Sequence, residues 1–262
     1  MNFIAIIPAR YSSTRFPGKP LAMLGGKYVI QRVCEQASKV LDSVYVATDD
    51  VRIENAVESF GGKAIMTRTD HQSGTDRLFE AYRKLNSDCN TNERETVIIN
   101  IQGDEPFILP EQITELMRCF DAPNTQIATL VMPFNNVKGC TIETIKNPNS
   151  PKVVIDDKGY AMYFSRSVVP YLRGLEEQEW PFHYEYMKHI GIYAYRADVL
   201  SEITKLPQSP LELAEKLEQL RWLQAGYRIK VGVTDMQTIG IDTPEDLKQA
   251  ELFLQLNSNL FK

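Results

Sequence analysis

The sequence begins with a run of apolar residues that is too continuous for a strand with one face in water. Residues 3–7 contain no polar side chain. Such strands are typical of parallel sheets that helices cover on both faces. Residues 97–101 form a similar run, interrupted only by Asn100. Segments with apolar residues at helical spacing lie between the predicted strands, so the chain favours a doubly wound α/β sheet.

Predicted strands and helices alternate through the first half of the chain. The predicted strands cover residues 3–7, 44–48, 64–66, 97–101 and 127–132. The first of them is expected to end at Pro8. Helices are predicted over residues 28–40, 53–60, 76–85 and 110–120. Glycines and prolines supply several of the boundaries, as at Gly61 and Pro110.

From about Pro133 the pattern changes, which predicts an antiparallel addition to the sheet. Residues 153–155 and 160–165 read as a β-hairpin, and strands follow at residues 189–195 and 228–233. One helix is expected from Pro210, with leucines at 213, 217, 220 and 223 as its core stripe, and another over residues 243–256. We expect a single domain of residues 1–262, in which residues 133–200 contain the smaller antiparallel portion.

Composition excludes several classes of protein. Hydrophobic residues make up 43% of the chain and charged residues 24%, with no apolar segment long enough for a membrane span. The net charge of −5 argues against a nucleic-acid surface. The four cysteines show no metal-ligand spacing, which indicates reduced thiols. No leader precedes the first strand, so we expect a cytoplasmic location.

A cationic loop follows the first predicted strand. Within residues 10–19 the chain places Arg10, Arg15 and Lys19 together with three hydroxyl side chains and a Pro-Gly turn. Cations and hydroxyl donors at the carboxyl end of a strand suit a polyphosphate. The glycine spacing fits neither a P-loop nor a dinucleotide fingerprint. A solvated basic loop would have the same composition, so this alternative stays open here.

Two acidic residues follow other predicted strands. Asp104 belongs to the segment Gln-Gly-Asp-Glu-Pro after residues 97–101, and Asp242 precedes the last predicted helix. Carboxylates facing a triphosphate would favour a bridging Mg²⁺. Either residue could instead be an ordinary turn or helix-start acid.

Several motifs together resemble the CMP-KDO synthetases, the 3-deoxy-manno-octulosonate cytidylyltransferases. The motifs occur in the same order as in that family and extend over nearly the whole chain. Segment 173–180 does not match the family's pattern. The motifs are IPARY at residues 7–11 with STR at 13–15 and PGK at 17–19, HQSGTDR at 71–77, QGDEP at 102–106, YFSR at 163–166, HIGIY at 189–193, LEQLR at 217–221 and DTPEDL at 242–247.

The resemblance implies a doubly wound, Rossmann-like nucleotide-diphosphosugar transferase fold with a mixed sheet and an antiparallel dimerisation extension. It implies that CTP and 3-deoxy-D-manno-octulosonate (KDO) are the substrates, that Mg²⁺ is required, and that the product serves lipopolysaccharide biosynthesis. A homodimer is also implied, with neither nucleic acid nor membrane as partner. For its interface we expect the segment 153–165 and the aromatic residues Trp180, Phe182, Tyr184 and Tyr186.

The resemblance also assigns roles to residues. The CTP phosphates would be held by Arg10, Ser13, Arg15 and Lys19, and the cytosine and its surroundings would be read by Arg77 and Gln102. Lys19, Asp104 and Asp242 would be catalytic, the two aspartates as ligands of Mg²⁺. The acid sugar would be bound by Arg166, His189, Tyr193, Glu218 and Gln219. A solvated position remains an alternative for Arg77, Glu218 and Gln219.

The implied reaction is in-line attack of the sugar's anomeric hydroxyl on the α-phosphorus of CTP, with release of pyrophosphate. Positioning and charge neutralisation would dominate such a transfer. Two alternatives remain: a cytidylyltransferase for another acid sugar, such as sialic acid or an 8-amino KDO analogue, and a non-catalytic nucleotide-binding module on the same scaffold.

Overall fold

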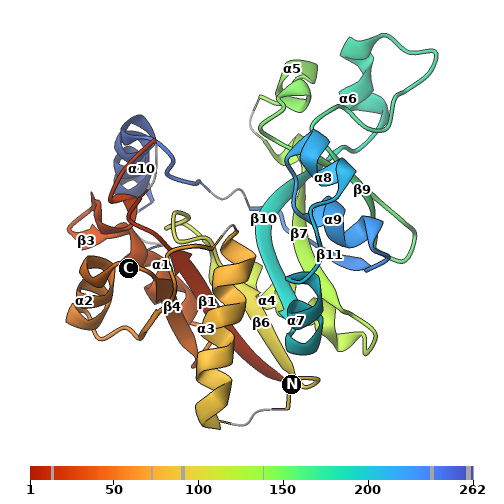
Figure 1. The fold of residues 1–262 in the computed structure, drawn as a ribbon. Helices are drawn as coiled ribbons and strands as arrows, with labels where there is room; N and C mark the ends of the chain where they lie inside the picture. The colour runs from red at the N-terminus through yellow and green to blue at the C-terminus, as the bar shows by residue number, and fades with distance from the viewer. Residues whose placement is uncertain are drawn as a thin grey trace. The chain divides into compact units, whose positions relative to one another are not determined.

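The described chain forms two compact units (Figure 1). The computed structural model describes residues 1–12, 15–71, 73–89, 92–137, 139–236, 239–257 and 261. Unit 1 comprises Met1–Thr114, Arg196–Thr204 and Thr238–Lys262, and unit 2 comprises Glu115–Tyr195 and Lys205–Gln237. The organisation into one domain with a smaller portion at residues 133–200 stays a prediction. No helix of the described residues is both long and apolar enough to cross a membrane.

Unit 1 is built on four parallel strands. They are β1 (Asn2–Ala9), β4 (Val44–Thr48), β5 (Ala64–Met66) and β6 (Thr96–Asn100), in the spatial order β6-β1-β4-β5. Apolar side chains of β1 and β6, among them Ile6 and Ile99, are completely buried. The continuous apolar runs therefore form strands that are covered on both faces, as the sequence predicted.

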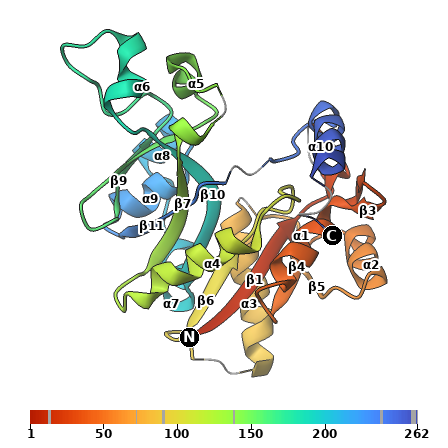
Figure 2. The ribbon, with the colours of Figure 1, turned by 180° about the vertical axis from the view of Figure 1, so that it is seen from behind.

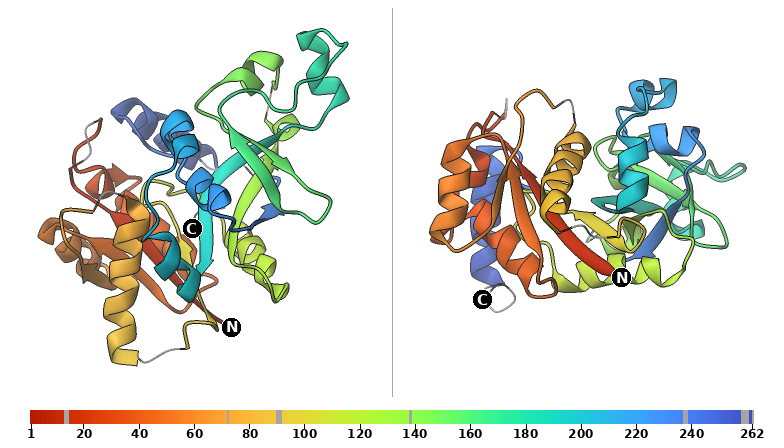
Figure 3. Two further views of the ribbon diagram at one scale, coloured as in Figure 1. Left: turned by 45° about the vertical axis from the view of Figure 1, so that its right-hand side comes forward. Right: turned by 60° about the horizontal axis from the view of Figure 1, so that its bottom comes forward.

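Helices cover both faces of these strands. α1 (Val29–Ser38) joins β1 to β4, α2 (Val51–Ser59) joins β4 to β5, and α3 (Gly74–Cys89) leads from β5 back to β6. Because parallel crossovers are right-handed, a connection that reverses direction places its helix on the opposite face. Figures 2 and 3 show α3 and the earlier helices on opposite sides of the strands. Strand order reverses between β1 and β6, which is where ligands bind in such sheets.

The end of β1 differs from the prediction. We expected Pro8 to end the strand, but β1 continues to Ala9 and pairs with β4 over its last residues. The main chain of Ile6 faces β6, since its carbonyl accepts from the amide of Ile101. Pro8, two residues later, faces the same side, where the β6 ladder has already ended. The missing amide hydrogen of Pro8 therefore breaks no pairing.

The remaining elements of unit 1 close its ends. They are η1 (Lys19–Leu21), β2 (Met23–Leu24), β3 (Lys27–Tyr28), α7 (Ala197–Ile203) and α10 (Pro244–Leu256). A small core joins the last segment of the chain to the first: Ile241, Ala250 and Phe261 pack with Leu24, Val29 and Phe107. This core fixes the segment before α10 beside the loops that follow β1 and β6. α4 (Pro110–Arg118) begins in unit 1, and η2 (Cys119–Asp121) follows it in unit 2.

Unit 2 is mostly antiparallel. β7 (Ile127–Pro133) pairs parallel with β11 (Ile229–Val233) and antiparallel with β10 (Met187–Arg196). β10 also pairs with β8 (Lys152–Ile155), which forms the predicted hairpin with β9 (Ala161–Ser165). The other elements are η3 (Phe134–Asn136), α5 (Ile142–Lys146), η4 (Glu177–Glu179), α6 (Trp180–His183), α8 (Pro210–Glu215) and α9 (Gln219–Gln224).

The prediction of a single helix from Pro210 was wrong. The chain forms two short helices, because Lys216 takes a left-handed conformation with φ 52° and ends α8. Of the predicted core stripe, Leu217 and Leu220 are buried, whereas Leu213 is half exposed. A buried ion pair holds the two helices together: the Arg221 guanidinium donates to both carboxylate oxygens of Glu212, at 2.5 and 2.7 Å.

Candidate active site

A pocket of about 330 Å³ lies at the carboxyl ends of β1 and β6, within unit 1. This is the position that the reversal of strand order predicts for a ligand. Seven residues that the sequence singled out line this pocket. They are Arg10, Arg15, Lys19, Arg77, Gln102, Asp104 and Asp242. Ser13, also predicted there, lies outside the described residues. The pocket's other lining residues are Pro8, Ala9, Pro20, His71, Ser73, Gly74 and Gly103.

Lys19 is the centre of the charge pattern in the pocket. It is 9% exposed, and its ammonium lies 2.5 Å from a carboxylate oxygen of Asp104 and 3.1 Å from one of Asp242. The preceding Gly18 has φ 72°, which turns the chain so that Lys19 starts η1. A side chain on Gly18 would also contact the ring of Tyr11 at 3.0 Å. The glycine of the cationic loop is therefore required for the position of Lys19.

Main-chain contacts fix the two aspartates. The carbonyl of Asp104 accepts from the amide of Ile241 at 2.9 Å, which ties the loop after β6 to the segment before α10. A capping box at Thr243 and Asp246 begins α10, and the Asp246 carboxylate also accepts from the amide of Asp242. Burial would raise the pKa of Asp246, but its hydrogen bonds with Asp242 and Thr243, together with the charge of Arg15, lower it.

A close approach of two loops explains the glycine of the QGDEP segment. A Cβ on Gly103 would lie 2.8 Å from the carbonyl oxygen of Pro8. Because real Cβ atoms do not approach a backbone oxygen so closely, only glycine lets the loop after β6 lie against the end of β1. This contact places Asp104 next to the cationic loop.

The residues present fit a hard divalent cation. Oxygens of Asp104 and Asp242 converge on one cationic nitrogen, and Arg15 contacts the second oxygen of Asp242 at 3.1 Å. The described residues contain no group of three or more histidine, cysteine or acidic side chains in metal-binding geometry. Mg²⁺ is commonly held by one or two carboxylates, with substrate phosphates and water completing its shell. The pair therefore suits Mg²⁺ that arrives with a nucleotide.

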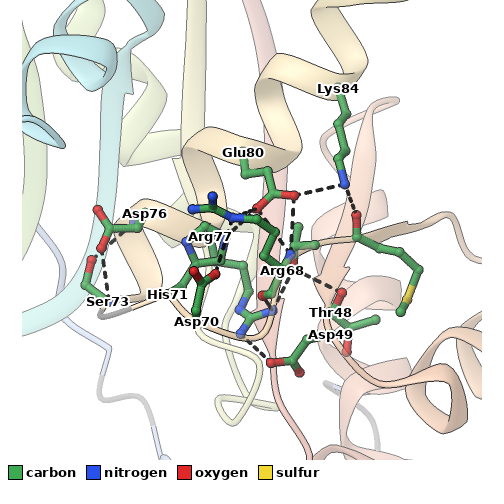
Figure 4. A network of polar contacts seen from close by, with 12 residues as sticks. Thr48, Asp49, Arg68, Asp70, His71, Ser73, Asp76, Arg77, Glu80 and Lys84 are labelled. Carbon is green, nitrogen blue, oxygen red and sulfur yellow. Dashed lines mark hydrogen bonds and ion pairs between the residues drawn. The ribbon is translucent and has the colours of Figure 1, made fainter.

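Arg77 lies in the pocket wall with its guanidinium already engaged. The side chain is 6% exposed and pairs with Asp49 at 2.8 Å. It also donates to the Thr67 hydroxyl at 2.6 Å and to the Arg68 carbonyl at 3.4 Å (Figure 4). The alternative of a solvated helix-surface arginine is therefore wrong. These three bonds use three of the five N–H donors of the guanidinium. The contact with the nucleotide base that the resemblance assigns to Arg77 stays a prediction.

The predicted sugar residues lie in unit 2, and two of them share a strand. His189 and Tyr193 are on β10, with ring centroids 5.3 Å apart. The His189 Nε2 lies 3.1 Å from the Thr129 hydroxyl, which itself donates to the carbonyl of Ile192 at 2.8 Å. Since a hydroxyl has one hydrogen, Nε2 must be the donor to Thr129. Burial lowers the pKa of His189 to about 3, so the ring is neutral near pH 7.

Unpartnered polar atoms gather among the same residues. The Tyr193 hydroxyl, the Gln219 side-chain nitrogen and the Trp222 indole nitrogen are buried and have no hydrogen-bond partner among the described residues. Tyr193 and Trp222 are in contact, with ring centroids 5.3 Å apart. Such atoms are costly to bury without a partner. The alternative of a solvated position is therefore wrong for Gln219, because only 5% of this residue is exposed. Glu218 is partly buried.

Arg166 differs from the other residues predicted to bind the sugar, because its side chain donates hydrogen bonds to three main-chain carbonyls. Its nitrogens donate to the carbonyls of Glu215 at 2.6 Å, Pro148 at 2.7 Å and Lys216 at 3.3 Å. These contacts stabilise the end of α8. The role of Arg166 toward a sugar carboxylate stays a prediction.

Comparison with known proteins gives the family. A family model described as cytidylyltransferase matches residues 4–230. The chain belongs to this family. A 3-deoxy-manno-octulosonate cytidylyltransferase of Parabacteroides distasonis is 61% identical, covering 97% of this chain and 98% of that protein. The enzyme of the same description from Bacteroides thetaiotaomicron is 58% identical over 98% of this chain and all of the relative.

One solved structure agrees with this cytidylyltransferase assignment, and a second shares the fold. A CMP:2-keto-3-deoxy-manno-octonic acid synthetase complexed with CTP has a TM-score of 0.86 and 42% identity, covering 98% of this chain and 99% of that one. A 4-diphosphocytidyl-2C-methyl-D-erythritol synthase from Anaerococcus prevotii, with a TM-score of 0.58 and 14% identity, covers 97% of this chain and 99% of that one. The latter shares the fold alone. The predicted doubly wound, mixed-sheet fold class is confirmed.

Sequence reasoning missed two acidic residues that contact the pocket wall of this cytidylyltransferase from behind its lining residues. Asp49 pairs with Arg77, and Glu80 contacts His71, which itself lines the pocket. Asp49 directly follows β4, a strand end on the same edge as the cationic loop, and that position was the available signal. Glu80 lies in the middle of a helix, where the spacing of polar residues gives no sign of a buried partner.

Proposed function

We propose that this enzyme transfers CMP from CTP to 3-deoxy-manno-octulosonate, with release of pyrophosphate. The observation that carries the proposal is the convergence of Lys19, Asp104 and Asp242 in a pocket that Arg10 and Arg15 also line. The relatives that carry this description match the chain over nearly its full length.

The cations of the pocket suit a triphosphate. Arg10 and Arg15 offer planar donor groups to phosphate oxygens, and Lys19 offers a compact charge on a mostly buried stem. In the reaction, Arg15 and Lys19 neutralise charge on the phosphates and hold the α-phosphorus in line with the attacking hydroxyl. No covalent enzyme intermediate is required.

Asp104 and Asp242 would hold Mg²⁺ against the triphosphate, where the cation would supply further neutralisation of charge. When phosphates arrive, they offer Lys19 a second set of anionic partners besides the aspartates. Before the nucleotide binds, the two aspartates keep the Lys19 ammonium inside the pocket. After it binds, they orient the ammonium toward the phosphates.

The sugar is the eight-carbon acid for which the relatives are named, and unit 2 supplies the residues for it. The buried polar atoms of Tyr193 and Gln219 can pair with sugar hydroxyls, which would remove the cost of leaving them unpartnered. Neutral His189 adds a hydrogen-bonding ring on the same strand. Glu218 and Arg166 complete the proposed set.

Pyrophosphate release tests the proposal directly. The purified enzyme is supplied with CTP, Mg²⁺ and one acid sugar at a time: KDO, its 8-amino analogue or sialic acid. We expect rapid release with KDO and slow release with sialic acid. Faster turnover of another sugar would reassign the substrate, and absence of release with all three would favour a non-catalytic nucleotide-binding protein.

A further inference from the structure

His71 is a residue of the pocket wall to which the proposed mechanism gives no role. It stands in the loop between β5 and α3, lines the same pocket as Arg77 and Gln102, and has a side chain that is 6% exposed. One ring nitrogen, Nε2, lies 2.5 Å from a carboxylate oxygen of Glu80 on α3 (Figure 4). The described residues offer the other nitrogen, Nδ1, no hydrogen bond.

Glu80 is held as a carboxylate by more than its contact with His71. It accepts from the main-chain amide of Arg68 at 3.2 Å and pairs with Lys84 at 2.9 Å. Burial alone would raise the pKa of Glu80, but Lys84, the Arg68 amide and His71 together lower it to about 2. An ionised carboxylate can only accept hydrogen bonds. The hydrogen in the contact between the two side chains therefore belongs to His71.

This contact determines which tautomer His71 adopts. In the neutral form of the ring, which carries one hydrogen, the contact with the Glu80 carboxylate places that hydrogen on Nε2. Nδ1 is then an acceptor of hydrogen bonds in the wall of a pocket that four cationic side chains also line. Cytosine carries an amino group, a donor, at the ring position where uracil carries a carbonyl oxygen. An acceptor in the wall attracts the first base and repels the second.

We propose that His71 is a specificity-determining residue, whose Nδ1 accepts a hydrogen bond from the exocyclic amino group of cytosine, and that Glu80 positions it. The inference rests on the proposed use of CTP at this site. It explains how the pocket distinguishes the two pyrimidines although much of the Arg77 guanidinium is engaged by Asp49, Thr67 and Arg68. Arg77 then supports the wall, and His71 reads the base.

Two substitutions at His71 separate the recognition of the base by Nδ1 from the contact of Nε2 with Glu80. The amide of glutamine can reach the position of Nε2 and preserve the contact with Glu80, but it leaves no acceptor at Nδ1. The shorter asparagine can place its oxygen near Nδ1 but cannot reach Glu80. We expect His71→Gln to lower the preference for CTP over UTP about 10-fold or more, the range of one hydrogen bond together with a repulsion. His71→Asn should retain more of this preference than His71→Gln.

Substitution of Glu80 tests the positioning role. In Glu80→Gln the new amide nitrogen can donate to Nε2, which moves the histidine hydrogen to Nδ1 and turns the acceptor into a donor. We expect this variant to gain affinity for UTP relative to CTP by about 10-fold, although residue 80 does not line the pocket. Lys84→Gln is the matched control, because it removes another partner of Glu80 and leaves His71 untouched. It should keep the wild-type ratio.

The experiment is equilibrium binding of CTP and UTP, each with Mg²⁺ and without sugar, to the full-length variants. A triphosphate of pyrimidin-2-one riboside, which lacks the amino group, is the third probe, and it should bind wild type and His71→Gln about equally. A CTP preference that is unchanged in His71→Gln overturns the proposal, as does an equal loss in Lys84→Gln and Glu80→Gln. Because binding is measured without transfer, a failure of the proposed reaction is seen separately, as an enzyme that binds CTP but releases no pyrophosphate.

Discussion

Lys19 shows how one residue organises the chemistry of the pocket. Its ammonium contacts two carboxylates that would repel each other without a cation between them. Asp104 lies 85 positions from Lys19 in the sequence and Asp242 lies 223 positions away. Together with Arg15, which pairs with Asp242, the three residues therefore form a charge-balanced cluster that exists only in the folded chain.

The two aspartates give the first prediction. Asp104→Asn and Asp242→Asn should each leave the fold intact, because the amide is nearly isosteric and keeps the turn. Each should lower turnover by about 10²-fold or more, since the substitution removes a negative charge that holds the cation and Lys19. Pyrophosphate release at saturating CTP and Mg²⁺ measures the effect. Asp157→Asn, at an exposed position, is the control. Wild-type turnover of either site variant would show that its carboxylate is only structural.

Arg77 gives a prediction that combines selectivity with stability. Arg77→Ala should weaken the preference for CTP over UTP, by removing the side chain that supports the pocket wall. It should also destabilise the protein by about 1–3 kcal/mol, because Asp49 loses its partner in a largely buried position. Urea unfolding measures the second effect. The double variant with Asp49→Ala should recover part of the lost stability, and no recovery would contradict the pairing argument.

At the scale of residues, sequence reasoning predicted seven residues that line one pocket but not all of their contacts. The cationic loop and the acids after other strands were predictable, because they follow strand ends that meet at one edge of a parallel sheet. The partners of Arg77 and His71 were not predictable, because Asp49 and Glu80 are ordinary acids until α3 packs against β4 and against the loop that precedes α3. Such pairings depend on tertiary structure, which residue spacing does not encode.

At the scale of elements, the helical region after Pro210 departs most from expectation. Its leucines recur at helical spacing, which predicted one helix, but Lys216 interrupts it with a left-handed conformation. Lysine has no local preference for that conformation, so no sequence signal marked the break. The Glu212–Arg221 ion pair joins the two helices across the break, and contacts of Arg166 with the carbonyls of Glu215 and Lys216 hold the turn.

Lys216 gives a prediction that belongs to this turn. Lys216→Gly should stabilise the protein by about 0.5–1 kcal/mol, because glycine adopts positive φ without the strain that a Cβ causes. Lys216→Ala removes the same charge and retains the strain, so it should give no such gain. Chemical denaturation of the two variants compares them, and equal stability would argue against strain at this residue.

The contacts of α3 give a prediction about acid. The pKa of Glu80 falls from an ordinary 4.5 to about 2 in the folded protein. A carboxyl group with a lowered folded pKa contributes stability above its unfolded pKa and loses it as the pH falls toward the folded value. Stability should therefore decline between pH 4.5 and 2, and more steeply in wild type than in Glu80→Gln. Thermal unfolding across this range checks the slope, and parallel curves would contradict the prediction.

At the scale of the whole molecule, the residues expected at a dimer interface include a buried group and an exposed group. Trp180 and Tyr186 are 3% and 1% exposed and belong to the core of unit 2, so their side chains are already packed within it. Phe182 is 86% exposed, and Met162 on the hairpin is 63% exposed. If the two-fold dimer forms as predicted, the second group supplies its apolar contacts.

The dimer prediction is tested in solution. Light scattering at micromolar concentration should give twice the mass of one chain, and Phe182→Ser together with Met162→Ser should shift the protein toward the monomer. Leu256→Ser, at an equally exposed position in unit 1, is the control and should leave the mass unchanged. A monomeric wild type would refute the assembly that we expect.

Unit 1 is assembled from three separate segments of the chain, and this has a consequence for the timing of protein synthesis. Ribosomes add about 5–20 residues per second. The 223 positions between Lys19 and Asp242 therefore correspond to roughly 10–45 s of translation. During that interval the emerging sheet contains the cationic loop and, later, Asp104, but lacks the second carboxylate. The nascent chain can begin to fold early, yet Lys19 gains its second carboxylate partner only after residue 242 has been added.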